Sequence, residues 1–200
     1  RRVRPLRSQG LTLVNKTWEA TVRVDADEQR RDKTGQIMVR VNELARRVAT
    51  HPNKLFTTLM LSGHTAACYD GHPFFDTDHA EGDSGTQSND ITHDAATPTA
   101  PTDVEMYEAI VQGIAQIMQI KDDQGEPMNE SAREFLIMVP LSFLSATLAA
   151  IATRTADAQR NPLVTGEPFR VTWVANPRLT WTDRFAIFRA DGSTRPFIFQ

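Results

Sequence analysis

The feature that most constrains this chain is a long segment, residues 34–62, whose apolar residues recur at helical spacing. They lie three or four positions apart and would form one stripe on a helix: Ile37, Val41, Leu44, Ala45 and Val48. Pro52 has no backbone N–H and predicts a kink or break near His51, but the apolar pattern resumes beyond it. Such a helix would be on the order of 40 Å long. We therefore expect one long, bent or two-piece helix in an extended, plate-like subunit.

The other periodic segments predict an α+β fold. Residues 17–24 alternate polar and apolar side chains around Trp18, as a half-buried strand does. Residues 64–101 have no sustained period and predict a long loop, after which Thr102 and Glu105 form a capping box that opens a helix. Further on, the sequence predicts a buried strand at 135–139, a helix at 142–153, a strand at 169–174 and a hairpin turning at Asp191-Gly192.

These patterns suggest four parts of the chain. Residues 1–16 are expected to be a basic arm or linker end, and residues 17–101 to hold the strand, the long helix and the long loop. Residues 102–183 are expected to form an α/β unit, followed by a returning hairpin at 184–200. Because the chain begins without methionine and stops directly after a strand-like run, we expect it to be an excerpt of a longer polypeptide.

Composition excludes several classes of protein. With 40% hydrophobic residues, 24% charged residues and a formal charge of -3, the chain matches globular proteins and lacks the basic excess of a dedicated nucleic-acid binder. The single cysteine, Cys68, excludes an internal disulfide and suggests a reducing compartment. No apolar run approaches the roughly 18 residues that span a bilayer, so we expect no membrane contact.

Histidine and aspartate residues gather in and around the predicted loop, and their side chains are common metal ligands. They are His64, His72, Asp76, Asp78, His79, Asp90 and His93. The spacing favours a structured loop, because neighbouring side chains alternate along an extended segment and aspartate often bonds to nearby backbone amides. A metal site at His72, Asp76, Asp78 and His79 is kept as the alternative.

Other signals of catalysis are absent from the sequence. There is no Gly-x-Ser-x-Gly, no Gly-x-Gly-x-x-Gly and no Walker-type Gly-Lys-Ser. We therefore assign no catalytic residue and no cofactor, and expect a structural protein rather than an enzyme.

One stretch of the loop resembles a known family. Residues Tyr69 to His79 read YDGHPFFDTDH, which is similar to the YDG-x-x-FFDTDH loop of major head proteins from Mu-like phages and prophages. Similar context lies upstream, in Ala49-Thr50-His51-Pro52 and Leu55-Phe56, and downstream, in Asn161 to Gly166 and Arg195 to Gln200. The resemblance covers roughly residues 17–200.

The resemblance implies the capsid fold of tailed phages, the HK ninety-seven type, with a peripheral domain that carries residues 34–62 as its spine helix, an axial domain, an extended loop and an N-terminal arm. It implies a subunit that assembles with itself into hexamers and pentamers of an icosahedral shell enclosing DNA, to which it would bind non-specifically. A scaffold or protease could act during assembly in the host cytoplasm, before the protein resides in the virion. A metal-dependent hydrolase and an encapsulin-like cargo shell are the alternatives, since fold alone does not separate shells by content.

The loop residues then take architectural roles. Gly71 and Pro73 would set its turns, Phe74 and Phe75 would pin it to a core or a neighbouring subunit, and Asp76, Asp78 and His79 would tie its backbone in place. Tyr69 and Asp70 belong to the same loop. Trp18 and the basic segment Arg1 to Arg7 are the candidates for contact between subunits.

Overall fold

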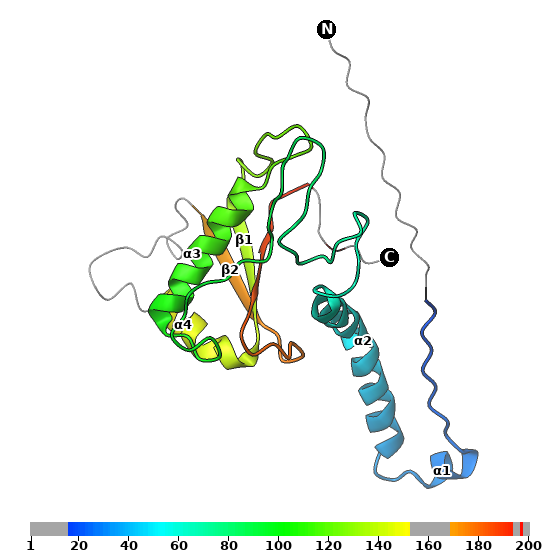
Figure 1. Ribbon diagram of the computed structural model, residues 1–200. Helices are drawn as coiled ribbons and strands as arrows, with labels where there is room; N and C mark the ends of the chain where they lie inside the picture. Colours follow the sequence, from blue (N-terminus) through cyan, green and yellow to red (C-terminus); the bar gives the residue numbers. More distant parts are fainter. Residues whose placement is uncertain (1–15, 153–168, 194–196, 198–200) are drawn as a thin grey trace. The chain divides into compact units, whose positions relative to one another are not determined.

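The structure is a computed structural model that describes residues 16–152, 169–193 and 197. It mixes helices with one sheet, which confirms the predicted α+β class (Figure 1). The chain divides into two compact units, one of residues 1–60 with 197–200 and the other of residues 61–196. The predicted basic arm, the segment Asn161 to Gly166 and most of the final hairpin lie outside the described residues.

The first unit is dominated by the predicted long helix. After a short helix, α1 (Ala26–Arg31), helix α2 runs from Gln36 to Ser62 without interruption at Pro52. The carboxylate of Asp32 accepts hydrogen bonds from the backbone N–H groups of Gln36 and Ile37, at 3.0 and 2.9 Å, and so satisfies amides that the first turn leaves unpaired. The hydrogen bond from Ile37 is the main reason why the pKa of Asp32 lies below its usual value.

The strand predicted at 17–24 is wrong, because residues 16–25 form no strand in the structure. An alternating pattern makes a strand only when a neighbouring strand supplies the ladder of hydrogen bonds, and no such pairing exists for this segment among the described residues. Trp18 instead packs its ring edge-on against His51 of α2, with ring centroids 4.7 Å apart, and remains 58% exposed.

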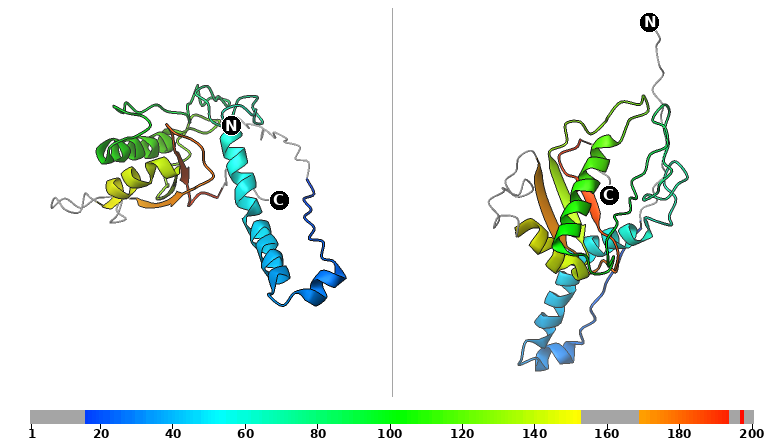
Figure 2. Two further views of the ribbon diagram at one scale, coloured as in Figure 1. Left: turned by 90° about the horizontal axis from the view of Figure 1, so that it is seen from below. Right: turned by 60° about the vertical axis from the view of Figure 1, so that its left-hand side comes forward.

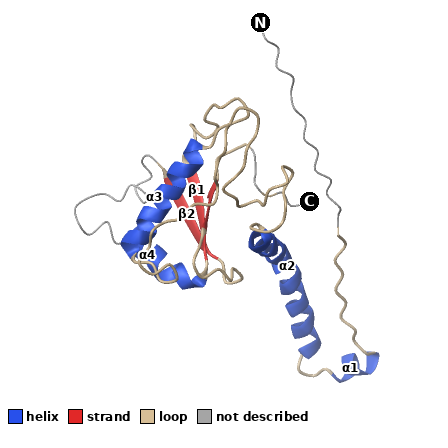
Figure 3. Ribbon diagram, in the orientation of Figure 1, coloured by secondary structure: helices blue, strands red, loops and turns tan. Residues whose placement is uncertain are grey.

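The second unit contains a three-stranded sheet in the order β2-β1-β3 (Figure 3). The central strand β1 (Glu134–Val139) pairs in parallel with β2 (Arg170–Ala175) and antiparallel with β3 (Ala186–Arg189). The apolar run that predicted a buried strand is therefore the middle strand, where neighbours cover it on both edges. Ile137, for example, lies opposite both Trp173 and Ile187.

Two helices cover one face of this sheet (Figure 2). Helix α3 (Asp103–Gln119) begins at the predicted capping box, in which Thr102 accepts from the N–H of Glu105 while the Glu105 carboxylate accepts from the N–H of Thr102. A short 3-10 turn, η1 (Leu141–Phe143), leads into α4 (Leu144–Ala152), close to the predicted helix at 142–153, whose last residue lies outside the described residues. The core comprises Met106, Ile110, Ile114, Ala132, Phe135, Ile137, Val139, Phe143 and Ala150.

The predicted long loop is confirmed, because residues 64–101 hold no helix and only isolated β-bridges, at Ala67 with Pro73 and at His79 with Gln87. Most of the second arm of the hairpin predicted at Asp191-Gly192 lies outside the described residues, so the hairpin stays a prediction; its first arm is β3, which pairs with β1. The Asp191 carboxylate accepts from the backbone N–H of Arg133, at 2.8 Å, and so links the end of β3 to the residue before β1. None of the described helices is long and apolar enough to cross a bilayer.

Candidate functional site

Asp70 is the polar centre of the segment from Tyr69 to His79. Its Oδ1 accepts from the backbone N–H of His72 at 3.1 Å, and its Oδ2 lies 2.7 Å from His79 Nδ1. The two side chains are only 12% and 23% exposed, so water competes little for this contact. Burial raises the pKa of Asp70, but the hydrogen bonds from His79 and His72 outweigh it and hold the pKa below its usual value.

A second histidine and aspartate pair stands beside the first. His72 Nδ1 lies 3.2 Å from Asp76 Oδ2, and the ring centroids of His72 and His79 are 6.1 Å apart. The backbone N–H of Thr77 donates to Asp76 Oδ1 and is the main cause that lowers the pKa of Asp76. Each imidazole therefore faces its own carboxylate: the Asp70–His79 pair joins the two ends of the segment, and the His72–Asp76 pair lies between them in the sequence.

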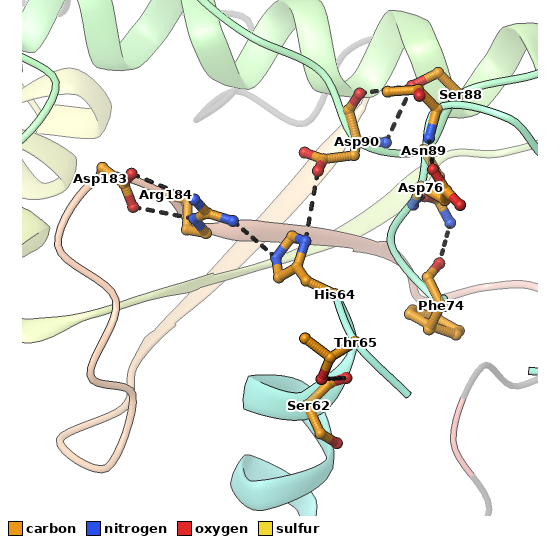
Figure 4. Close-up of polar contacts among 11 residues, drawn as sticks. Ser62, His64, Thr65, Phe74, Asp76, Ser88, Asn89, Asp90, Asp183 and Arg184 are labelled. Atoms are coloured by element: carbon orange, nitrogen blue, oxygen red, sulfur yellow. Dashed lines mark hydrogen bonds and ion pairs between the residues drawn. The ribbon is translucent and has the colours of Figure 1, made fainter. Parts of the chain in front are cut away.

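Asn89, which the sequence did not single out, joins this loop to the next part of the chain. Its Oδ1 accepts from the N–H of Asp76 at 2.9 Å, and its Nδ2 donates to the carbonyl of Phe74 at 2.6 Å (Figure 4). A side-chain amide has both an acceptor and a donor, so Asn89 makes the two hydrogen bonds that a neighbouring strand would otherwise make with this backbone segment. No sequence pattern identifies this role, because the partners are 13 and 15 positions away.

The two phenylalanines take different positions. Phe75 packs against His64 and Trp181, with ring centroids 5.0 and 6.0 Å apart, and its N–H donates to the carbonyl of Gly63. Phe74 packs edge-on against Phe75 at 4.9 Å. Phe75 thus fastens the loop next to the end of α2, while Gly71, with φ of 87°, occupies the left-handed region that favours glycine and turns the chain.

A row of polar contacts connects the loop of the second unit with the segment before β3 (Figure 4). It joins Asp90 and His64 to Arg184 and Asp183. Arg184 Nη1 donates to His64 Nε2 at 3.1 Å, and His64 Nδ1 lies 3.5 Å from Asp90 Oδ2. Asp183 binds the other side of the Arg184 guanidinium, which lowers the pKa of Asp183. Because a guanidinium only donates, the hydrogen bond places the His64 proton on Nδ1, facing Asp90.

The structure brings together some of the metal candidates but does not gather them into one site. Among the described residues there is no group of three or more His, Cys, Asp and Glu side chains that could hold a metal ion. His72, Asp76 and His79 lie close together as separate pairs, whereas Asp78 is exposed. His93 contacts Gln112 of α3 instead, at 2.9 Å.

A carboxylate paired with an imidazole also orients the base of nucleophilic enzymes, and the thiol of Cys68, a nucleophilic group, lies two positions before Asp70 of this pair in the sequence. Cys68 and His79 line the same open cavity of about 260 Å³. Burial and, next, the charge of Asp70 raise the pKa of Cys68, which keeps the thiol protonated and unreactive. The arrangement is suited to holding a loop and poorly suited to covalent catalysis.

Comparison with known proteins places this loop in a family. Residues 1–101 match the family model described as the Mu-like prophage major head subunit gpT. The chain belongs to this family. The match includes α2 and the whole of the Tyr69 to His79 loop, so the resemblance seen in these residues is confirmed. The family match ends at residue 101, and the similarity suggested for Asn161 to Gly166 and Arg195 to Gln200 stays a prediction.

Two relatives support membership in the Mu-like head subunit family. The major capsid protein of Escherichia phage Mu is 34% identical over 79 residues, which cover 40% of this chain and 26% of that protein. The Mu-like prophage FluMu major head subunit of Haemophilus influenzae (strain ATCC 51907 / DSM 11121 / KW20 / Rd) is 29% identical over 104 residues, covering 51% of this chain and 34% of that protein. The matched part of the chain thus spans about a quarter to a third of these relatives. No solved structure gives a significant match.

Proposed function

We propose that this protein is a structural subunit of a phage or prophage head and assembles with its own copies into a shell. The observation that carries the proposal is the family match over residues 1–101, which contains both the long helix and the polar loop. The two relatives are named as a major capsid protein and a major head subunit. A shell subunit acts through interfaces repeated by symmetry, for which an exposed helix and a stiff loop are suitable parts.

The finer architecture belongs to the same proposal. Helix α2 would be the spine helix of the HK ninety-seven type of capsid fold, and its 27 continuous residues support that role. The unit of α3, β1, α4 and β2 would correspond to the axial domain, and residues 17–101 to the peripheral domain. Hexamers and pentamers would form the shell around non-specifically bound DNA, with assembly in the host cytoplasm, a scaffold or protease acting during assembly, and final residence in the virion.

The segment from Tyr69 to His79 would serve this shell as architecture. The contacts of Asp70, Phe75 and Asp76 support the role, because each of them fixes backbone within the second unit. Tyr69 is 60% exposed and would be available to a neighbouring subunit. Trp18, also exposed, would be an anchor between subunits.

Electron microscopy of the purified protein tests the proposal. We expect closed particles or ring-shaped oligomers. A protein that remains a monodisperse monomer at all concentrations would contradict it. Trp18→Ala should weaken assembly, and assembly equal to that of the wild type would refute the role given to Trp18.

A further inference from the structure

We propose that one face of α2 docks onto the acidic second unit of another copy of this chain. This inference rests on the proposed function, because it names the partner surface through which subunits would associate. The feature behind it is an apolar seam along α2, in which positions repeat at intervals of four and three. The seam residues are Ile37, Val41, Leu44, Val48, His51 and Leu55.

None of the six seam residues is buried: Val41 and Val48 are exposed, and the other four are half-buried. Val41 is 40% exposed and Val48 59%, and Met38 beside them is 60% exposed. The residues that α2 buries are Thr57 and Met60, near its C-terminal end. Intervals of four and three are the spacing with which helices pack against partner surfaces, so a seam that stays exposed or half-exposed over several turns indicates a partner. Trp18 adds an exposed aromatic ring to the same face through its contact with His51.

A basic row borders the seam on one side. Arg40, Arg47 and Lys54 are seven positions apart, which places them almost in line along the helix, and all three are exposed. Arg47 is paired with Glu43, whereas Arg40 and Lys54 have no acidic partner among the described residues. Two such helices packed antiparallel would set these rows against each other, so the charge favours an acidic partner over a second α2.

The rest of the chain supplies that acidic partner. Residues 1–60 contain 13 Lys and Arg against 6 Asp and Glu, a formal charge of +7, whereas residues 61–200 contain 9 against 19, a charge of −10. The division into two compact units falls at the same place, between Met60 and Leu61. Exposed carboxylates of the second unit include Asp83, Asp123 and Glu126. The two units of different copies therefore attract each other, while like units repel.

This charge division predicts a head-to-tail contact. A surface that binds a different surface of the next copy generates rings or open arrays, whereas a self-complementary surface stops at a dimer. It also predicts that assembly weakens with ionic strength, because exposed charges are largely screened beyond about 8 Å at physiological salt.

Matched substitutions in α2 of the full chain test the docking face. Val48→Asp places a charge in the seam, and Val39→Asp places the same charge outside it at a residue of nearly equal exposure, 57% against 59%. Arg40→Glu and Arg46→Glu form a second pair, in the basic row and away from it. Sedimentation velocity over a range of protein and salt concentrations measures assembly, and circular dichroism verifies that each variant is folded.

We expect Val48→Asp to raise the concentration needed for assembly at least about tenfold, because docking would bury a carboxylate without a partner, and Val39→Asp to leave it within about twofold. Arg40→Glu should weaken assembly about three- to tenfold at low salt and much less at high salt, with little effect of Arg46→Glu. Equal behaviour of Val48→Asp and Val39→Asp in a wild-type protein that assembles overturns this inference and leaves the proposed function standing. A wild-type protein that never assembles overturns both.

Zero-length coupling of amines to carboxylates identifies the partner. In a mixture of isotope-labelled and unlabelled protein, Lys54 should couple to carboxylates of residues 61–196 on a different copy. Coupling of Lys54 only within its own copy would show that α2 packs inside one chain and would refute the docking. A loss of duplex DNA binding in Arg40→Glu without any change in assembly would assign the face to nucleic acid and refute it as well.

Discussion

Replacing Asp70 by asparagine tests whether the polar loop is held by its charge. The substitution keeps the shape and the oxygen that accepts from the N–H of His72, but it removes the carboxylate that faces His79 at 2.7 Å. A hydrogen bond to a charged group contributes about 1.5–3 kcal/mol. Because Asp70 is only 12% exposed, solvent screening reduces that value little. We therefore expect the loop to open about 10 to 150 times more often.

Hydrogen exchange by mass spectrometry measures this opening in peptides covering residues 64–90. Asp78→Asn is the matched control, because Asp78 belongs to the same loop and is exposed; we expect it to change exchange by less than about threefold. Equal exchange in the two variants would show that the carboxylate of Asp70 does not hold the loop and would refute the reasoning.

The same contact predicts a dependence on pH. The pKa of Asp70 is lower in the folded protein than its usual value, so the folded state favours the carboxylate. The stabilisation is complete above the unfolded pKa of about 3.9 and is lost as the pH falls through the lower, folded value. The difference in exchange between the wild type and Asp70→Asn should therefore be full near neutral pH and shrink below about pH 4.

Two further substitutions test the core and the loop pairing of the second unit. Ile110→Ala, at a fully buried position of α3, should destabilise this unit by about 2–5 kcal/mol in urea unfolding. Its control, Val111→Ala, lies at a 42% exposed position and should lower the free energy of unfolding by less than about 1 kcal/mol. Equal losses in the two variants would contradict the core described here. Gly82→Ala would bring a Cβ to 2.4 Å from the Asp123 carbonyl oxygen, so hydrogen exchange should rise at 81–85 and 121–126. Gly85→Ala shares the positive φ but meets no atom within 4 Å, and an equal rise there would assign the effect to backbone strain alone.

Local patterns predicted the elements whose stability is local. Helix α2 follows from apolar residues at intervals of three and four, and α3 begins at Thr102 because the capping box is complete within four residues. The family resemblance of Tyr69 to His79 was likewise detectable in one contiguous stretch, because it depends on residue identities and not on distant contacts.

The wrong or incomplete predictions concern features that need distant partners. Residues 17–24 alternate as a strand does, but alternation cannot supply the neighbouring strand that its backbone needs. In the same way no local pattern shows that the antiparallel partner of β3 is β1, about 50 residues earlier in the chain. The site residues that sequence reasoning missed, Asn89 and Arg184, act on groups far away in the sequence.

The sequence by itself determined the α+β class, the long helix, the capped helix, the buried central strand and the family, because periodicity, capping and residue identity are properties of short stretches. Only the tertiary structure decided what the histidines and aspartates of the loop do. It pairs Asp70 with His79 and His72 with Asp76, and it brings Arg184 into contact with His64, which lies 120 positions earlier in the sequence. These partners are chosen by the packing of loops and strands, since a side chain bonds with whatever the folded backbone brings within about 3 Å.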